Sequence, residues 1–139
     1  MIRFLCDTNV VLDFLLRREP WIVEARQLWL AHRENRIEAC ITATTLTDVF
    51  YVSRRQIGID MAWRSIHACL DTLPIIPVDQ AVLRNASALS GRDFEDNIQI
   101  AGAMAFDVDF IVTRDVSGFI DSRIPVVTPA VFLAENCSP

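Results

Sequence analysis

The stretch IRFLCDTN at residues 2–9 decides the fold. Its first five residues, IRFLC, form a short apolar run that is typical of a buried strand. The next three, Asp7, Thr8 and Asn9, have side chains that cap helix N-termini, and we therefore predict a helix over residues 10–16. A strand, a turn and a helix in direct succession are the opening unit of an α/β fold.

The same alternation continues along the chain. We predict four further strands, at residues 37–41 (IEACI), 74–78 (PIIPV), 109–113 (DFIVT) and 124–127 (IPVV). Helices are predicted between them, at residues 21–31, 44–54, 60–70, 79–90, 94–106 and 129–134. Because these strands are continuous apolar runs separated by helices, they predict a parallel sheet of about five strands that is covered on both faces.

Three aspartates are expected to cap helices, and one helix has a marked apolar pattern. Asp60, Asp79 and Asp93 each precede a helical segment, where an N-cap carboxylate accepts a bond from a free backbone N–H. In the segment after Asp60, we expect four apolar side chains to make packing contacts, namely Met61, Trp63, Ile66 and Leu70.

Length and composition predict one domain that spans residues 1–139. Apolar residues make up 52% of the chain and charged residues 22%, which is enough apolar surface for a core and too little charge for disorder. The longest run without charge, residues 124–134, is short and contains two prolines, so we expect no membrane span. Four scattered cysteines without a CxxC pair predict reduced thiols and a cytoplasmic protein.

The charge pattern narrows the class of function. The net charge is −5, which argues against a basic groove for nucleic acid, but all thirteen basic residues are arginine, the better bidentate phosphate ligand. A metal ion held by carboxylates would also reverse the sign of an acidic site locally. The absence of lysine disfavours P-loop nucleotide-binding proteins, two-component receivers and haloacid-dehalogenase-type phosphatases, which need a lysine in the active site.

Four aspartates are expected at one edge of the sheet. Asp7 and Asp115 each follow a predicted strand, and the carboxyl ends of parallel strands form the ligand site of open α/β sheets. Asp96 lies in the first turn of the helix that leads into the strand at 109–113. Asp48 interrupts an apolar helical segment, where burying an unpaired charge is costly.

Each of these residues also has a purely structural interpretation. Asp7 can cap a helix, Asp96 can be a favourable anion at a helix N-terminus, and Asp115 can be a turn residue. Taken together, crowded carboxylates cannot all ionise without a compensating charge, and a divalent cation would supply it. Oxygen ligands alone suit Mg²⁺ or Mn²⁺, and an ion of this kind activates water for attack on a phosphodiester.

The spaced motifs DTN at 7–9, TATTLTD at 42–48, DFEDNIQIA at 93–101 and IVTRD at 111–115 resemble the PIN domain family, and within it the VapC-like toxin ribonucleases. The resemblance covers essentially the whole chain. It implies a three-layer α/β/α sandwich around a parallel sheet and Mg²⁺- or Mn²⁺-dependent endoribonuclease activity on RNA. It also implies a homodimer and, for a toxin, a cognate antitoxin protein.

By position in these motifs, four aspartates match the family's acidic catalytic and metal-binding residues, namely Asp7, Asp48, Asp96 and Asp115. Asp93 is an additional acidic candidate, and the matching supporting polar positions are Asn9, Thr44 and Thr113. One position departs from the family pattern, because Asp48 stands where the family usually has the longer glutamate.

Two other functions stay open on the sequence. One is a catalytically silent PIN-like module that binds RNA or a protein partner, which the short Asp48 and the acidic charge would suit. The other is a small α/β interaction domain whose aspartates only cap helices. The apolar helices around 21–30 and 61–70 can serve as dimer or antitoxin surfaces, although core packing is favoured.

Overall fold

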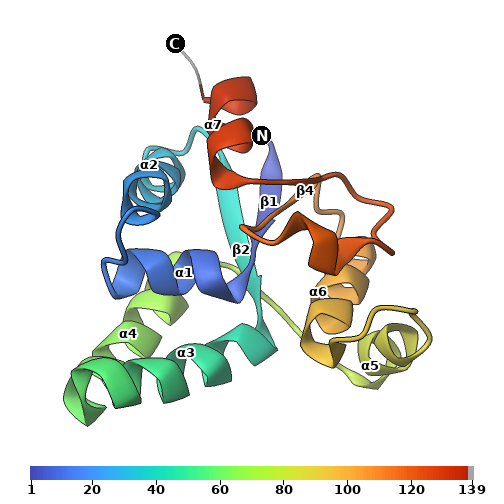
Figure 1. Cartoon of the computed structure of the whole chain (residues 1–139), viewed down its shortest axis with the longest axis horizontal. Helices are drawn as coiled ribbons and strands as arrows, with labels where there is room; N and C mark the ends of the chain where they lie inside the picture. Colours follow the sequence, from blue (N-terminus) through green and yellow to red (C-terminus); the bar gives the residue numbers. More distant parts are fainter. Residues whose placement is uncertain (138–139) are drawn as a thin grey trace.

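The computed structural model describes residues 1–137, which form a five-stranded, all-parallel sheet between helical layers (Figure 1). The strands are β1 (Arg3–Cys6), β2 (Glu38–Thr42), β3 (Ile75–Ile76), β4 (Phe110–Val112) and β5 (Val126–Val127). Their spatial order is β3-β2-β1-β4-β5, so the first strand lies in the centre of the sheet. Phe4 pairs with Ala39 of β2 on one side and with Phe110 of β4 on the other. The predicted parallel α/β sheet is confirmed.

In the described part of the chain, seven α-helices and one 3-10 turn connect or follow the strands. They are α1 (Thr8–Leu15), α2 (Ile22–Arg33), α3 (Ala43–Ile57), α4 (Ile59–Thr72), α5 (Gln80–Ser87), α6 (Phe94–Ala105), η1 (Val116–Phe119) and α7 (Pro129–Asn136). Figure 1 shows α1 and α2 on one side of the sheet and α5 and α6 on the other. Within residues 1–137, no helix combines the length and the apolar character that a membrane crossing requires.

The two faces of the sheet bury two separate apolar clusters. Side chains of a strand alternate between its faces, so Phe4 and Leu5 point in opposite directions. Phe4 packs in the cluster that includes Phe132 of α7, with ring centroids 4.8 Å apart. Leu5 packs in the cluster that includes Ile100 of α6 and Ile111 of β4. A core on each face of the sheet confirms the three-layer α/β/α sandwich.

Two of the predicted strands are reduced to a pair of residues. The segments at 74–78 and 124–127 pair over only two residues each, Ile75–Ile76 and Val126–Val127. Prolines limit both, because Pro74, Pro77 and Pro125 have no N–H to donate to a neighbouring strand.

The expected helix caps are confirmed at two sites and wrong at the third. Asp79 accepts a bond from Val82 N, and Asp93 accepts one from Asp96 N, as predicted for N-caps. Asp60 is not a cap, because α4 begins one residue earlier, at Ile59. Gly58 precedes that helix with φ at +89°, a conformation that glycine adopts without steric cost and in which the chain turns sharply from α3 into α4.

The expected packing of α4 is also wrong in part. Ile66 packs against the core, and Trp63 packs on the Phe50 ring of α3 with centroids 4.8 Å apart, although its side chain is half exposed. Met61 and Leu70 are also about half exposed and lie outside the core. The buried positions of α4 are instead the small residues Ala62, Ser65 and Cys69. Small side chains let α4 lie close against α3, which leaves the large apolar side chains of this helix on the outside.

Candidate active site

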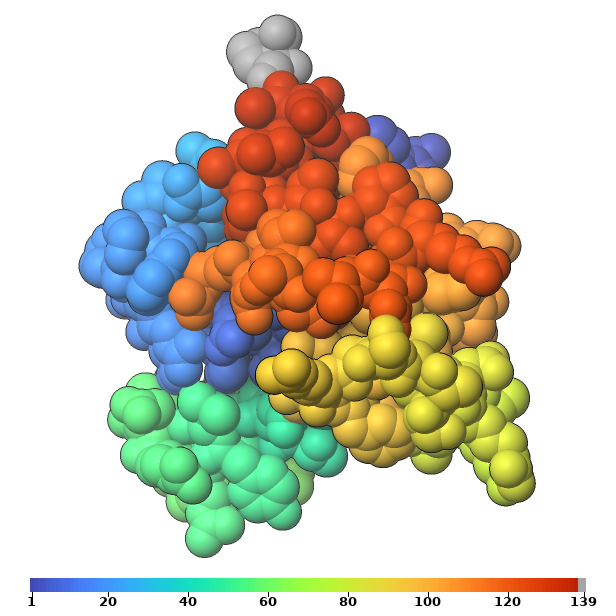
Figure 2. Space-filling view, turned by 45° about the vertical axis from the view of Figure 1, so that its right-hand side comes forward, coloured from blue at the N-terminus to red at the C-terminus, as the bar shows by residue number. Residues whose placement is uncertain are grey.

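An acidic pocket opens where β1 and β4 end and where α1, α3 and α6 present their side chains. The cavity is about 380 Å³, and its lining residues are Asp7, Thr8, Asn9, Leu12, Asp48, Val52, Asp93, Glu95, Asp96, Asp115 and Phe119. In Figure 2 the N-terminal segment appears in blue between the α3–α4 hairpin in green and the segment after β4 in orange. The structure therefore brings the five aspartates expected from the sequence to one pocket.

The parallel pairing of β1 with β4 explains why Asp7 and Asp115 meet. Cys6 pairs with Val112 at the carboxyl ends of these strands, so the residues that follow both strands emerge at the same edge of the sheet. The α3 and α6 helices bring the remaining carboxylates to this edge from opposite layers of the sandwich.

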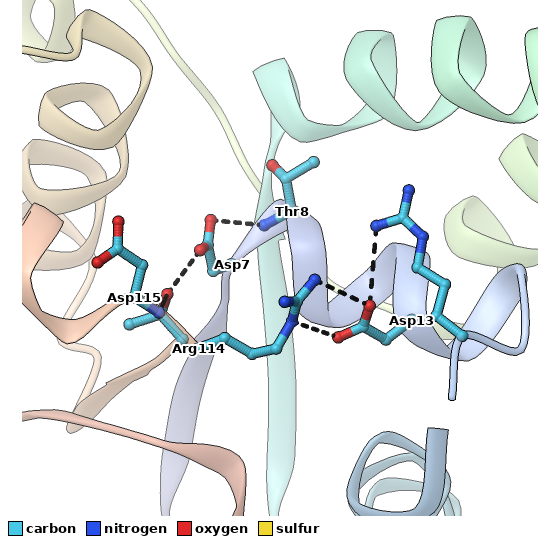
Figure 3. A network of polar contacts seen from close by, with 7 residues as sticks. Asp7, Thr8, Asp13, Arg114 and Asp115 are labelled. Atoms are coloured by element: carbon cyan, nitrogen blue, oxygen red, sulfur yellow. Dashed lines mark hydrogen bonds and ion pairs between the residues drawn. The ribbon is translucent and has the colours of Figure 1, made fainter. Parts of the chain in front are cut away.

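Asp7 is almost completely buried, with 6% of its surface exposed, and three donors fix its carboxylate. Thr8 N donates to Oδ1 at 2.7 Å, Gln99 Nε2 donates to Oδ1 at 2.9 Å, and Thr113 Oγ1 donates to Oδ2 at 2.7 Å. The first of these bonds caps α1, as Figure 3 shows. Capping and pocket lining are thus not alternatives for Asp7, since the same side chain does both.

Asp96 and Asp115 face a common small space beside Gly118. A Cβ built on Gly118 would lie 3.0 Å from Asp96 Oδ2 and 3.2 Å from Asp115 Oδ2, so any larger residue would intrude between them. Burial, together with the neighbouring carboxylates of Asp93, Asp7 and Asp115, raises the pKa of Asp96 to about 7. The two oxygens with the glycine between them form a cradle open to a small cation.

Glu95 is a pocket residue that the sequence did not reveal. Its Oε1 accepts a hydrogen bond from Thr8 Oγ1 at 2.9 Å, and its carboxyl is hydrogen-bonded to Asp48 of α3. Burial raises the pKa of Glu95 to about 8, helped by the bond to Asp48 and opposed by the bond from Thr8. In the sequence, the glutamate stands in the first turn of a helix, where a carboxylate is expected for helix stability alone.

Gln99 is the second residue that the sequence did not reveal. Its side chain is fully buried, and its Nε2 donates to Asp7, while no described residue bonds to its Oε1. Gln99 lies one helical turn after Asp96, so the two project from the same face of α6. A polar residue within the otherwise apolar run IQIAGA at 98–103 was the available signal.

The three polar residues expected to support the site differ in their placement. Asn9 lines the pocket directly. Thr113 lies beneath it, fully buried, and its Oγ1 both donates to Asp7 and accepts from Asp115 N. Thr44 is not a lining residue, and its hydroxyl bonds to that of Thr42 at 3.1 Å.

Arg114, directly before Asp115, points away from the pocket and into an ion pair (Figure 3). Its Nε and Nη2 donate to the two oxygens of Asp13 at 2.8 Å and 3.2 Å. Its guanidinium lies 3.9 Å above the Trp21 ring. Asp13 is only 1% exposed, and burial raises its pKa although Arg114 and Arg18 lower it. Arg114 therefore holds the segment that carries Asp115, and its guanidinium is not free to bind phosphate.

The pocket fits a hydrated divalent ion better than a fully dehydrated one. Among residues 1–137, no three His, Cys, Asp or Glu side chains lie close enough to surround one ion directly. Mg²⁺ is usually bound through one or two carboxylates and keeps several water ligands, and the cradle of Asp96 and Asp115 offers such a pair. The donor set is all oxygen, as hard divalent cations prefer.

Comparisons with known proteins agree with this architecture. A family model described as "PIN domain" matches residues 3–117. No curated protein matches the chain. A toxin–antitoxin complex from Klebsiella pneumoniae is similar in structure with a TM-score of 0.65 and 24% identity, over 90% of this chain and 96% of that one.

Two further solved structures have the same fold. The DNA-bound VapBC of Salmonella typhimurium has a TM-score of 0.68 at 15% identity, over 93% of this chain and 99% of that one. VapC20 of Mycobacterium tuberculosis, a toxin that cleaves the sarcin–ricin loop, has a TM-score of 0.65 at 12% identity, over 78% and 86%. At such low identity the likeness concerns the arrangement of the backbone.

Proposed function

This chain belongs to the PIN domain family, and from that premise we propose that it is a metal-dependent endoribonuclease that hydrolyses RNA phosphodiester bonds. We also propose that residues 1–139 form a single PIN-like domain. The observation that carries the proposal is the convergence of Asp7, Asp48, Asp96 and Asp115 on one pocket at the carboxyl edge of the sheet. The cleavage of the sarcin–ricin loop by VapC20 supports RNA as the substrate.

The residues of the pocket have separable tasks in this reaction. Asp96 and Asp115 would hold Mg²⁺ or Mn²⁺ through the cradle at Gly118, and Asp7 would present a carboxylate fixed by its three donors. A bound divalent ion supplies an activated water and stabilises the leaving oxygen of the phosphodiester.

Apolar side chains form the rest of the pocket. Leu12, Val52 and Phe119 line it beside the carboxylates. They lower the local dielectric constant beside the carboxylates, so the attraction between the acidic groups and a cation is stronger than it would be in bulk solvent.

We further propose that the protein is the toxin of a toxin–antitoxin pair, a homodimer that acts in the cytoplasm. The Klebsiella and Salmonella structures are toxin–antitoxin assemblies, which supports a cognate antitoxin. Half-exposed apolar side chains support a protein interface: Trp21 directly before α2, Leu30 on α2, and Trp63 and Leu70 on α4. The four free cysteines suit a reducing compartment.

The second candidate is a catalytically silent PIN-like module that binds RNA or a protein partner. It is favoured by one observation, that within residues 1–137 the carboxylates do not enclose a direct ligand set for one ion. A silent module would still bind RNA or a partner protein, but its affinity for either would not depend on Mn²⁺.

Metal titration and RNA cleavage by the same preparations separate the two functions. We expect the purified protein to bind Mn²⁺ in calorimetry and to cleave RNA in a reaction that EDTA stops. Asp7→Asn and Asp96→Asn should lose both properties, whereas Glu135→Gln, at an exposed position of α7, should keep them. Cleavage that persists in EDTA and in both aspartate variants would refute the proposed activity.

A further inference from the structure

We infer that Glu95 is a fifth carboxylate of the proposed metal site. Together with Asp48, it would supply the acidic ligand on the α3 side of the pocket. This inference rests on the metal-dependent activity proposed above. The two carboxyls come from different helices, Asp48 from α3 and Glu95 from the first turn of α6. They are hydrogen-bonded to each other within the pocket that Asp7, Asp96 and Asp115 also line.

A row of four hydrogen-bonded threonine hydroxyls holds Glu95 in place. Because each hydroxyl has one hydrogen to donate, the donor of every bond in this hydroxyl chain is fixed. Thr8 Oγ1 carries one hydrogen and donates it to Glu95 Oε1, so the contact of 3.0 Å to Thr45 must be a bond that Thr45 donates. Thr45 has then no hydrogen left for Thr42, 3.2 Å away, and Thr42 must be the donor there. By the same count, Thr44 donates to Thr42.

The hydroxyl chain thus ends at Glu95 and runs through the core of the domain. Thr42 and Thr45 are fully buried, and Thr8 is nearly so. Each hydroxyl in the chain orients the next, so the donor presented to Glu95 is fixed before any ligand arrives. The bond from Thr8 therefore fixes the position of Glu95 Oε1 within the pocket.

The neighbouring carboxylate, Asp93, has a different task. Its Oδ1 accepts a hydrogen bond from Asp96 N at 3.0 Å and so caps α6, and the residue is exposed to solvent. Glu95, two residues further along the chain, contacts Asp48 of α3 instead. Of the two acidic residues that flank Phe94, Asp93 stabilises the helix and Glu95 faces the cation.

Gln99 gives independent support for a ligand in this pocket. Its amide is fully buried and donates to Asp7 from Nε2, yet no described residue bonds to its Oε1. A buried carbonyl oxygen without a partner is costly, and a water bound to a metal ion would provide the donor that it lacks.

The test is Mn²⁺ affinity measured by calorimetry on the full chain, with thermal unfolding of each variant as the check on folding. Glu95→Gln keeps the shape and removes the charge, and we expect it to weaken Mn²⁺ binding about tenfold or more. Asp93→Asn removes one charge from the same helical turn and still caps α6, so it measures the purely electrostatic loss, which we expect to be about threefold or less.

Two further variants distinguish a ligand from a general charge effect. Thr8→Val removes the last donor of the hydroxyl chain and should weaken binding while every carboxylate remains in place. Asp48→Glu, added to Glu95→Gln, lengthens the carboxylate on the α3 side and should restore part of the lost affinity.

Equal Mn²⁺ affinity in the wild type and in Glu95→Gln would overturn the role of Glu95 and leave the proposed metal-dependent activity intact, provided that Asp96→Asn abolishes binding. Equal losses in Glu95→Gln and Asp93→Asn would also overturn it. A wild-type protein that binds no Mn²⁺ would overturn both proposals together.

Discussion

The metal-free protein should lose stability as the pH rises from 5 to 8, because two pocket carboxyls have raised pKa values. In the folded chain the pKa of Glu95 is about 8 and that of Asp96 about 7, against ordinary values of 4.5 and 3.8. Between the ordinary and the raised values, the folded state binds more protons than the unfolded state. Stability therefore falls with rising pH through this window, which is the opposite of the effect of a salt-bridged aspartate.

The size of the effect follows from the same values. Each pKa unit corresponds to about 1.4 kcal/mol. Without screening by solvent, the two pKa shifts together would therefore change the free energy of unfolding by nearly the whole stability of a domain, about 5–15 kcal/mol. Both side chains are partly exposed, and solvent screens their charges, so we expect a net loss of about 2–3 kcal/mol. For a domain of this size, that loss lowers the melting temperature by roughly 10 °C.

The assay is thermal unfolding followed by circular dichroism at pH 5, 6, 7 and 8 in EDTA, with the double variant Glu95→Gln/Asp96→Asn alongside. The double variant should be the more stable protein at pH 8 and should lose only a small part of the ~10 °C that the wild type loses. Saturating Mn²⁺ should flatten the wild-type curve, because a bound cation removes the repulsion. A wild-type melting temperature independent of pH, or an equal slope in the variant, would refute the reasoning.

Three further predictions concern the surroundings of the pocket. Arg114→Ala leaves the buried Asp13 carboxylate with only the longer ion pair to Arg18, at 3.7 Å, and should cost about 3 kcal/mol in urea unfolding. Adding Asp13→Asn should recover part of that loss, and strict additivity of the two changes would argue against the ion pair as the cause. Gly118→Ala places a methyl group between Asp96 and Asp115 and should weaken Mn²⁺ binding in calorimetry with little change in unfolding; unchanged affinity would exclude the cradle. Phe132→Ala empties the fully buried site against Phe4 and should cost about 3–5 kcal/mol in urea while the folded fraction keeps its Mn²⁺ affinity.

The sequence was sufficient to predict those parts of the site that depend on strand order. Asp7 and Asp115 directly follow apolar runs, and parallel pairing then brings them to one edge of the sheet. Asp48 was found because its charge interrupts an apolar helical face, and Asp96 because its helix leads into the strand that ends before Asp115.

Glu95 and Gln99 could not be found in this way. Whether Glu95 reaches Asp48 depends on the rotation of α6 about its axis, which is decided by contacts between the layers and not by the local sequence. The apolar pattern of α4 was misleading for a related reason, since close packing through Ala62 and Ser65 left Trp63 outside.

The central place of β1 has a consequence for the protein while it is still being synthesised. Asp7 receives a bond from Thr113, 106 residues later in the chain, and β1 pairs with β4 at the same distance along the sequence. At about 5–20 residues per second, β4 follows β1 out of the ribosome by roughly 5–20 s. During that interval the nascent chain carries its first aspartate without the residues that complete the pocket. A ribosome that makes this protein is thus not exposed to the assembled acidic pocket, the proposed catalytic centre, until β4 has been translated.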